Sequence, residues 1–600
     1  MWSLFKVECL RFRTLALIAA GVHVCALGFG TRLIDLAQLS LLSDRALGGV
    51  YALAGALLGV YQMGGYRRGS QWITLLHRPV APARIALTLC AAAGVVLLGA
   101  VLLPAVLLAT WQQGTTARVV DLRHWLLPGS AWLIAMAGYL AGAFWALRGL
   151  RTALAAAALL AWLACADATG PAMLAIELVV VAWLLALVLG AFKPDVEATP
   201  RGPLASALFA LPLSAGAYLV LLLMLFGIEF LWIAQGSHPL NSTVPPPGGH
   251  TEVERMDARA RMRLALREAT PPDLERLEAA VTASKPQGLA VRLREWPQRN
   301  AMANAAPLQF EDAERRIRWT FSHDSMQLQG EQLLDGRAAG TLGVWPRGQP
   351  FPAVALPIGQ LPGLPSEDTV LLAGDTLYRY DSARERVVPL VRVRAGESIT
   401  GAGRVGERWV LLSDQALSVF RASPAAGDGT LVAPPARVAL PDSNRRLSSL
   451  DMVALDDGML VSLVYSELAH TSDGAQPRRV LLRIFDDGRP AVIHAKALSF
   501  DYPALHRYRS WWPSPVLHTA LERAQRLLAP TSPQPAPRPA PIPVPVMVLA
   551  GCLMLASAVL ATYRTQRVGM GKRARLGWIA FCALFGLPGL AAVLLMKPRA

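Results

Sequence analysis

Long apolar runs fill the first 234 positions of the chain and return after position 542. A helix of roughly 20 apolar residues crosses a membrane core about 30 Å thick. In lipid, the helix is the conformation in which a single segment satisfies its own backbone hydrogen bonds. The pattern predicts a polytopic α-helical membrane protein with nine spans, at 14–31, 47–63, 85–109, 130–147, 152–166, 173–191, 204–234, 543–563 and 576–596.

The segment before the first span has a different character. Residues 1–13 are basic and amphipathic, and no small-residue cleavage site follows them. We therefore expect no cleavable signal peptide. Instead, the pattern predicts an interfacial helix that leads into the first span, with Trp2, Phe5, Lys6 and Glu8 at the membrane surface.

Lysines and arginines indicate the orientation of the spans. With the N-terminus inside, the inner loops hold 16 of them, whereas the short outer loops and the C-terminal tail hold 6. Because basic loops remain in the cytoplasm, we expect a cytoplasmic N-terminus and an external region at 235–541. No cysteine falls between Cys165 and Cys552. An exported domain without disulfides fits the bacterial periplasm, so we expect a multi-pass protein of the inner membrane.

The external region changes pattern along its length. Helical spacing predicts a helical segment within 235–305, and alternation with turn residues predicts an all-β domain over 306–500. Gly374-Asp375-Thr376-Leu377 resembles Ser413-Asp414-Gln415-Ala416, with the aspartates 39 positions apart, and Asp457 follows 43 positions later. A period of about 40 is typical of β-propeller blades, so we expect a propeller-like domain, while a plain β-sandwich remains open.

The end of the chain returns to the membrane. A helix near 514–528 and the Pro-rich stretch 530–545 predict a helix and semi-rigid linker over 501–545. Two closing spans then occupy 546–600. With the seventh span at 204–234, this gives an external domain inserted between two sets of spans.

Composition and motifs exclude several functions. The net charge of +16 would suggest nucleic acid in a soluble chain, but 53% apolar content and a mean hydropathy of +0.37 indicate membrane loops instead, so we expect no nucleic-acid partner. Gly569-Met570-Gly571-Lys572 lacks the spacing of a phosphate-binding loop, and no hydrolase or zinc motif occurs in a credible context. We expect no catalytic residue, metal site or cofactor in this chain.

One acidic residue lies inside a predicted span. Glu177 belongs to the sixth span, where burying a charge in lipid is costly. Two interpretations are open: Glu177 lines a polar path between helices, or it reaches the outer surface or pairs with a nearby base.

The loop between the second and third spans is the most informative segment. It runs from Gly64 to Arg84 and holds four arginines and no acidic residue, so it belongs on the cytoplasmic side. Its centre, from Trp72 to Leu76, predicts one or two turns of amphipathic helix. Pro79 stops this helix, and Arg84 opens the next span.

Residues 1–195 resemble the six-span permease core of ABC-2-type ATP-binding-cassette exporters. The likeness rests on Lys6-Val7-Glu8 near the start and on Arg67-Arg68-Gly69-Ser70, Trp72-Ile73, Leu75-Leu76, Arg78-Pro79-Val80 and Arg84 in the loop. The resemblance implies that this loop docks on a separate ATPase subunit, which binds ATP and Mg²⁺. It also implies that two permease chains, in a homodimer or a heterodimer, form the pore.

The chain departs from that family after position 204, so no substrate is carried over. The added β domain would guide cargo or recruit a periplasmic partner. A different class of function stays open: a non-transporting, membrane-anchored scaffold or sensor that binds through its β domain. A membrane enzyme is a third interpretation, without a supporting motif.

Overall fold

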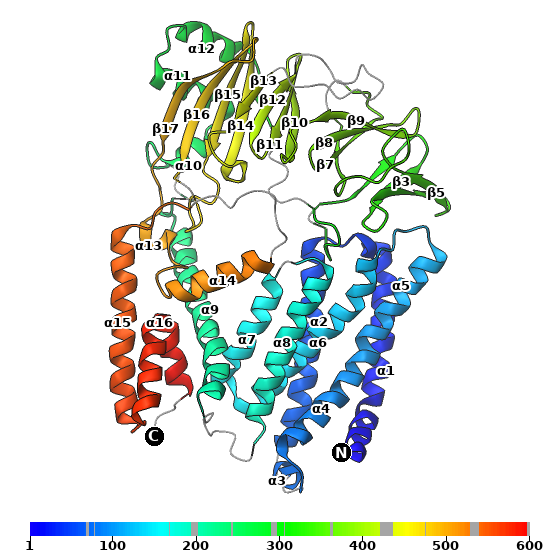
Figure 1. Cartoon of the computed structure of the whole chain (residues 1–600), viewed down its shortest axis with the longest axis vertical. Helices are drawn as coiled ribbons and strands as arrows, with labels where there is room; N and C mark the ends of the chain where they lie inside the picture. The colour runs from blue at the N-terminus through cyan, green and yellow to red at the C-terminus, as the bar shows by residue number, and fades with distance from the viewer. Residues whose placement is uncertain are drawn as a thin grey trace.

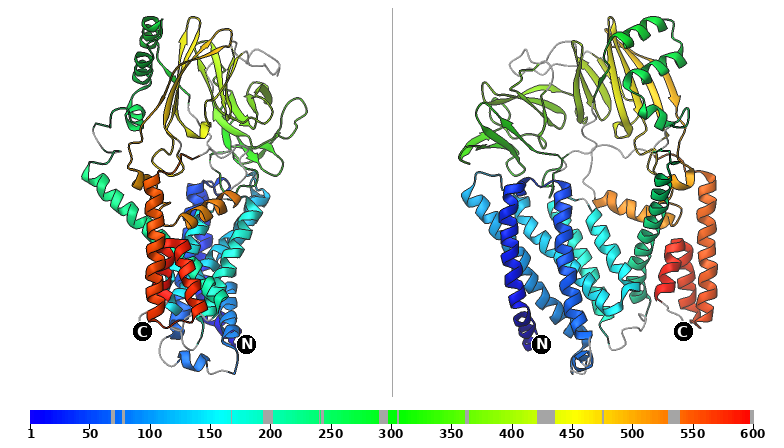
Figure 2. Two further views of the ribbon diagram at one scale, coloured as in Figure 1. Left: turned by 60° about the vertical axis from the view of Figure 1, so that its left-hand side comes forward. Right: turned by 180° about the vertical axis from the view of Figure 1, so that it is seen from behind.

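A computed structural model of the chain describes all residues except 68–70, 77–78, 167, 194–201, 240, 242–243, 290–296, 305, 361–363, 421–435, 475, 529–538 and 597–600. It has two parts: a bundle of long apolar helices and a region of antiparallel β-sheets beyond one end of that bundle (Figure 1). We call the bundle end next to the β region the proximal end. The opposite end, where both ends of the described chain lie, is the distal end (Figure 2).

Eight helical stretches among the described residues are long and apolar enough to cross a membrane. They are α1 (Trp2–Leu33), α2 (Leu41–Arg67), the continuous α4 (Pro82–Leu97), η2 (Leu98–Leu102) and α5 (Leu103–Thr115), α6 (Leu122–Arg148), α8 (Gly170–Ala191), α9 (Pro203–Gln235), α15 (Val544–Arg567) and α16 (Lys572–Met596). The shorter apolar helix α7 (Leu150–Cys165) occupies the predicted fifth span. Short elements η1 (Leu36–Gln38) and α3 (Gln71–Leu76) lie between these helices.

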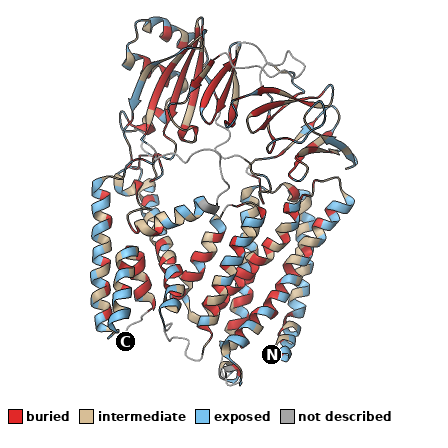
Figure 3. Ribbon diagram, viewed as in Figure 1, coloured by how far each residue is buried: buried red, intermediate tan, exposed pale blue. Residues whose placement is uncertain are grey.

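The outer faces of the bundle are apolar and exposed. Leu223, Leu231 and Leu555 are among many large apolar side chains that the rest of the protein leaves uncovered, and Figure 3 shows exposed faces along most of the helices. Exposed apolar surface of this extent marks contact with a membrane. The chain is therefore a membrane-embedded protein.

The N-terminal segment differs from the prediction. Helix α1 runs without a break from Trp2 to Leu33, so residues 1–13 do not form a separate interfacial helix. They are the distal part of the first membrane helix. Helix continuity satisfies the backbone donors and acceptors that a break inside lipid would leave without partners.

The last predicted span also needs correction. Helix α16 contains Gly586 with φ 62° and ψ −141°, followed by Pro588, and this break divides it into two helical halves. A Cβ on Gly589 would lie 3.2 Å from the carbonyl oxygen of Phe581. In a straight helix, residues eight positions apart are separated by about 12 Å along the axis, so this helix cannot be straight. The two halves therefore run antiparallel, as Figures 1 and 2 show. Met596 returns to the distal end, on the side of Lys572, so residues 576–596 form a re-entrant hairpin rather than a span.

Glycines bring α2 and α6 into contact along their backbones. Gly55 and Gly59 of α2 face Gly138 and Gly142 of α6, one helical turn apart in each helix. A Cβ at Gly55 would lie 1.9 Å from the carbonyl oxygen of Ala135, and a Cβ at Gly138 would be similarly close to α2. Small residues allow this approach, which is how helices associate in lipid without a hydrophobic driving force.

The β region contains seventeen strands among its described residues, and all ladder pairs between them are antiparallel. They are β1 (Gln287–Gly288), β2 (Gln309–Asp312), β3 (Ile317–Ser322), β4 (Gln327–Gln332), β5 (Ala338–Leu342), β6 (Leu356–Gly359), β7 (Thr369–Ala373), β8 (Thr376–Asp381), β9 (Arg386–Arg392), β10 (Ile399–Val405), β11 (Arg408–Ser413), β12 (Ala416–Phe420), β13 (Ala436–Ala439), β14 (Leu447–Leu455), β15 (Gly458–Tyr465), β16 (Arg478–Phe485) and β17 (Pro490–Ala497). Four sheets result, with strand orders β2–β5, β6–β9, β10–β13 and β1-β14-β15-β16-β17.

The sequence repeat corresponds to a structural repeat. Asp375 lies in the β7–β8 turn, Asp414 in the β11–β12 turn and Asp457 in the β14–β15 turn. In each sheet this turn joins the second and third strands of the sheet order. The period of about 40 residues is therefore the length of one four-stranded unit.

The four sheets pack in chain order. Trp319, Leu371 and Trp409 of the first three sheets share one apolar core, and Val410 and Val461 share the next core between the third and fourth sheets. Helices α10 (His250–Arg255), α11 (Ala258–Ala269) and α12 (Leu274–Ala283) precede the sheets. Of these, α11 and α12 cover the remaining face of the fourth sheet through a separate apolar core, as Figure 1 shows.

The return to the membrane contains two helices, α13 (Ala504–Arg507) and α14 (Pro515–Leu528). Helix α14 matches the helix predicted near 514–528. Most of the Pro-rich stretch, 530–538, lies outside the described residues. In Figure 1 and in the right-hand view of Figure 2, α14 lies across the proximal end of the short helix α7.

Candidate functional site

The loop between α2 and α4 holds the short helix α3 where the sequence predicts one. The ring of Trp72 meets the ring of Phe192, just after α8, with 4.9 Å between centroids and 64° between planes. Leu75 is only 4% exposed. Helix α3 is therefore packed against the distal end of the bundle, with Pro79 after it and Arg84 exposed in the first turn of α4.

Arg67 ties the end of α2 to the end of α6. Its Nη1 atom donates to the carbonyl oxygens of Ala146 at 2.7 Å and Leu147 at 3.0 Å. Carbonyls in the last turn of a helix lack helical partners and carry partial negative charge, so an arginine stabilises them. Arg68, Gly69 and Arg78, together with the side chains of Ile73 and Leu76, lie outside the described part of the chain.

An exposed aromatic and basic patch covers the first turns of α1. Trp2, which is 66% exposed, stacks on Phe5 with 5.4 Å between ring centroids. The Nζ atom of Lys6 lies 5.1 Å from the centroid of the Trp2 ring. Aromatic and basic side chains of this kind are enriched at membrane surfaces.

Glu8 does not belong to that surface patch, contrary to the prediction. It is 1% exposed, and its carboxylate accepts hydrogen bonds from Gln62 Nε2 at 2.6 Å and Tyr66 Oη at 2.5 Å. Gln62 Oε1 in turn accepts from Tyr139 Oη at 2.7 Å. Because Glu8 is on α1, Gln62 on α2 and Tyr139 on α6, this buried network joins three helices near the distal end.

Glu177 lies buried between α8 and α6. One of its oxygens, Oε1, accepts a hydrogen bond from Ser130 Oγ at 2.5 Å. The other, Oε2, is buried and has no hydrogen-bond partner among the described residues. Glu177 therefore does not reach the protein surface, and no described base pairs with it; a polar path between helices stays a prediction.

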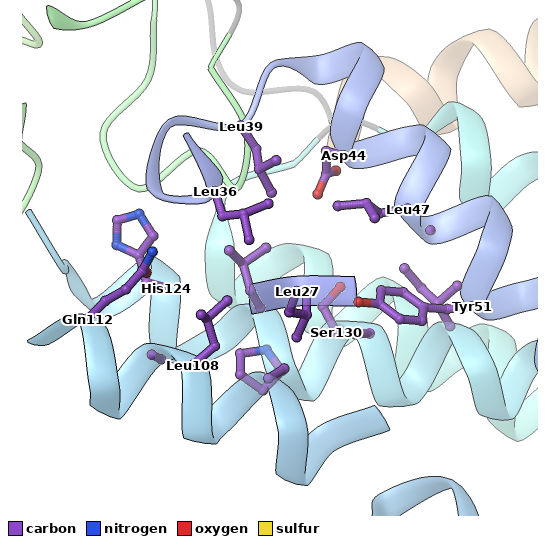
Figure 4. Close-up of a pocket in the computed structure, with 17 residues that line it drawn as sticks. Leu27, Leu36, Leu39, Asp44, Leu47, Tyr51, Leu108, Gln112, His124 and Ser130 are labelled. Carbon is purple, nitrogen blue, oxygen red and sulfur yellow. The ribbon is translucent and has the colours of Figure 1, made fainter. Parts of the chain in front are cut away.

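Two cavities open beside the first turn of α2, near the proximal end. The first holds about 100 Å³ between α1, α2, α5 and α6, and the second holds about 140 Å³ between α2, α6, α7 and α8. Both are lined by Asp44, Gly48, Ser130 and Ile134. Figure 4 shows Asp44 and Ser130 among the mostly apolar side chains that line the first cavity.

The β region is docked on the bundle through buried polar contacts. Asp121, which caps α6, accepts hydrogen bonds from Ser322 Oγ at 2.7 Å and from the backbone N–H groups of His323 and Asp324 at 2.9 and 3.4 Å. The side chain of Asp324 accepts in return from the backbone N–H of Leu122 at 2.8 Å. The β3–β4 turn and the start of α6 therefore form one hydrogen-bonded unit.

Arg123 extends this docking contact. Its Nη1 atom donates to Asn304 Oδ1 at 2.6 Å and to the carbonyl oxygen of Ala301 at 3.3 Å. His323 lies in the same buried cluster, and its Nδ1 atom accepts a hydrogen bond from the backbone N–H of Asn300 at 3.0 Å. Burial, reinforced by the charge of Arg123, lowers the pKa of His323 to about 3. The docked state therefore holds this ring neutral.

Comparisons with known proteins do not assign the chain to a class: no family model and no curated protein matches it. The described residues contain no group of three or more His, Cys, Asp or Glu side chains that could hold a metal ion.

Sequence reasoning found the distal loop and Glu177 but missed the polar groups at the proximal end. Asp44 was passed over although an acid in the first turn of an apolar helix is a visible signal. Asp121 directly precedes the fourth apolar helix, a typical capping position. The sequence pattern does not distinguish Arg123 from the other basic residues of the predicted outer loops. Nothing in the sequence indicates that Ser322 and His323, 200 positions later, meet this cap.

Proposed function

We propose that the chain is the membrane-spanning permease subunit of an ABC-2-type transporter in the inner membrane of a bacterium. A separate ATPase subunit would bind and hydrolyse ATP with Mg²⁺, and this chain would carry no enzymatic activity. Two permease chains, identical or different, would form the pathway. The distal end would then face the cytoplasm, and residues 235–541 would lie in the periplasm.

Helix α3 is the observation that carries this proposal. A loop that only joined two spans would need neither a helix nor a fixed seat, yet Trp72 and Leu75 pack α3 onto the bundle. Exposed positions in the same region, such as Arg84, remain available for a partner. A short helix packed in this way can bind an ATPase subunit and transmit its conformational change to the bundle.

Helices α2 and α6 are packed tightly enough to transmit that conformational change through the bundle. Helix α2 leads directly into the loop that holds α3, and α2 is joined to α6 by backbone contact at four glycines and by Arg67. Helix α6 begins at the proximal side, where its capping residue Asp121 forms the docking contact with the β3–β4 turn. A displacement at the distal end would therefore move α2 and α6 together as one rigid body and carry the motion to the proximal end.

The β region would serve as an external binding domain. It has four successive antiparallel sheets, three of four strands and one of five, with a repeat of about 40 residues, and this supports a propeller-like domain. Such a region would guide cargo or recruit a periplasmic partner. Its firm docking on α6 also fits the second class of function, a membrane-anchored scaffold or sensor.

Co-purification in a mild detergent distinguishes the two classes. The permease proposal predicts a stoichiometric partner with a phosphate-binding loop of its own. Trp72→Ala combined with Arg78→Glu should abolish that association, since it removes the contact with Phe192 and reverses one charge of the loop. Arg84→Glu should weaken it as a single change.

The matched control is Arg45→Glu, a charge reversal at an exposed arginine of the opposite end of the bundle. It should leave the association unchanged. If the loop variants fold and still bind the ATPase with full activity, the docking site is wrong. If only envelope proteins co-purify, bound through the β region, the scaffold or sensor replaces the permease.

A further inference from the structure

The first cavity has an unusual combination of lining groups. Leu27, Leu36, Leu47 and Leu108 supply apolar walls, and the Asp44 carboxylate stands among them. No hydrogen bond or ion pair to the Asp44 side chain is found among the described residues. A carboxylate in apolar surroundings is costly unless a cation or hydrogen-bond donors meet it.

The neighbouring cationic groups do not fill this role. Arg45, the next residue along α2, lines the second cavity and not the first, although its charge acts on Asp44. His124 lines the first cavity, but its Nδ1 atom accepts from the backbone N–H of Asp121 at 2.8 Å and its Nε2 atom lies 2.8 Å from the carbonyl oxygen of Ala37. These partners require a proton on Nε2 alone, so the ring is neutral.

A second carboxylate lies behind the wall that both cavities share. Ser130 lines both cavities and donates to Glu177, whose Oε2 atom is fully buried without a partner among the described residues. Because Asp44 and Ser130 line the same two cavities, Glu177 lies one hydrogen bond behind the lining to which Asp44 belongs. The capping preference for acids in the first turn of a helix accounts for Asp44 alone. It does not account for the buried Glu177 or for the empty space between the helices.

We propose that the first cavity binds amphipathic cations, with an ammonium or guanidinium group at Asp44 and an apolar body against the leucine walls. The Ser130 hydroxyl oxygen, which lines the cavity, would accept a hydrogen bond from that head group, with the Glu177 carboxyl group behind it. An engineered cavity of about 150 Å³ holds a benzene-sized molecule, so the space matches a short alkyl chain. This site exists whether or not the chain is a permease; within the proposed function it defines the class of cargo.

The test compares three five-carbon probes of equal length: n-pentylammonium, n-pentanol and pentanoate. The full chain in nanodiscs of zwitterionic lipid is titrated with each, and binding is followed by ligand-observed NMR and by the unfolding temperature. Pentylammonium should bind saturably, pentanol more weakly and pentanoate not at all. Asp44→Asn, which keeps the shape, should weaken pentylammonium by about 10- to 100-fold, the usual loss for a charged hydrogen bond. Pentanol binding should stay unchanged.

Two further variants keep the test decisive. Leu108→Trp fills the cavity without a change of charge and should abolish binding of both pentylammonium and pentanol. Glu522→Gln removes an acid from α14, away from the cavity, and should change nothing. If pentylammonium binds no more tightly than pentanol, or if Asp44→Asn binds it as well as the unaltered chain, the proposal is overturned. If the chain binds pentylammonium saturably but no ATPase co-purifies with it in mild detergent, the site is supported and the permease is contradicted.

Discussion

Replacing Gly59 by alanine tests the close backbone contact between α2 and α6. The added Cβ would lie 2.1 Å from the carbonyl oxygen of Tyr139 and 2.7 Å from the amide nitrogen of Ala143. Both are backbone atoms of α6, and neither can rotate away as a side chain would. Since ordinary contact begins at 3.4 Å, α2 and α6 must separate locally by about 1.3 Å, a gap that removes about half of the dispersion attraction across it.

The expected cost is about 3 kcal/mol, the upper end of the range for overpacking. The assay is thermal or denaturant unfolding of the full chain in detergent, followed by tryptophan fluorescence. Gly49→Ala and Gly64→Ala are matched controls on the same helix, because a Cβ at either position meets nothing within 4 Å. They should be neutral or should stabilise α2 by up to about 1 kcal/mol, since alanine favours helix. The reasoning is refuted if Gly59→Ala unfolds at the same temperature as Gly64→Ala.

Three further predictions concern the polar contacts. Glu8→Ala leaves buried donors without an acceptor and should cost about 1–3 kcal/mol for each of them, measured by the same unfolding assay. Asp121→Ala should leave the β-sheets folded but loosen their docking, seen as faster hydrogen exchange at the backbone amides of His323 and Asp324. Docking should also weaken as the pH falls from about 6.5 towards 3, because an undocked His323 takes up a proton below its ordinary pKa whereas the docked ring, with a pKa lowered to about 3, does not. The measurement is hydrogen exchange at the β3–β4 turn as a function of pH.

Each of these predictions has its own control. Glu522→Gln should leave the unfolding temperature unchanged, in contrast to Glu8→Ala. Exchange in the β15–β16 ladder should be the same in Asp121→Ala as in the unaltered chain, and a general loss of protection would show that the variant unfolds the sheets instead. His323→Asn, whose side-chain oxygen can accept from Asn300 in place of Nδ1, should remove most of the pH dependence; an unchanged pH profile would contradict the assignment to His323.

The sequence predicted the membrane helices well because the bilayer imposes a simple rule of length and hydrophobicity. The same rule failed at α16, since it counts apolar residues and does not register the reversal at Gly586. It also misplaced Glu8: an amphipathic pattern shows which residues share a face, but not whether that face meets lipid headgroups or another helix. Span length alone likewise does not distinguish an interfacial helix from the first turns of α1.

The β region shows a similar division. Strand alternation and the repeat of Asp375, Asp414 and Asp457 gave the four-stranded unit, because turns and strands follow local rules. The packing of the four sheets against one another could not be predicted from the sequence, since it depends on which sheet faces bury each other. That α11 and α12 occupy the far face of the fourth sheet is a property of packing between distant segments.

By itself, the sequence determined that this is a membrane protein with a separate β region and with a short helix in the loop after the second span. These features depend on local hydrophobicity, turn residues and helix signals. Only the tertiary structure decided that Asp121 holds the β3–β4 turn, that α2 and α6 touch along four glycines, and that Asp44 lines the same two cavities as Ser130, which donates to the buried Glu177. These contacts join residues tens to hundreds of positions apart, and their energy arises only when the chain brings them together.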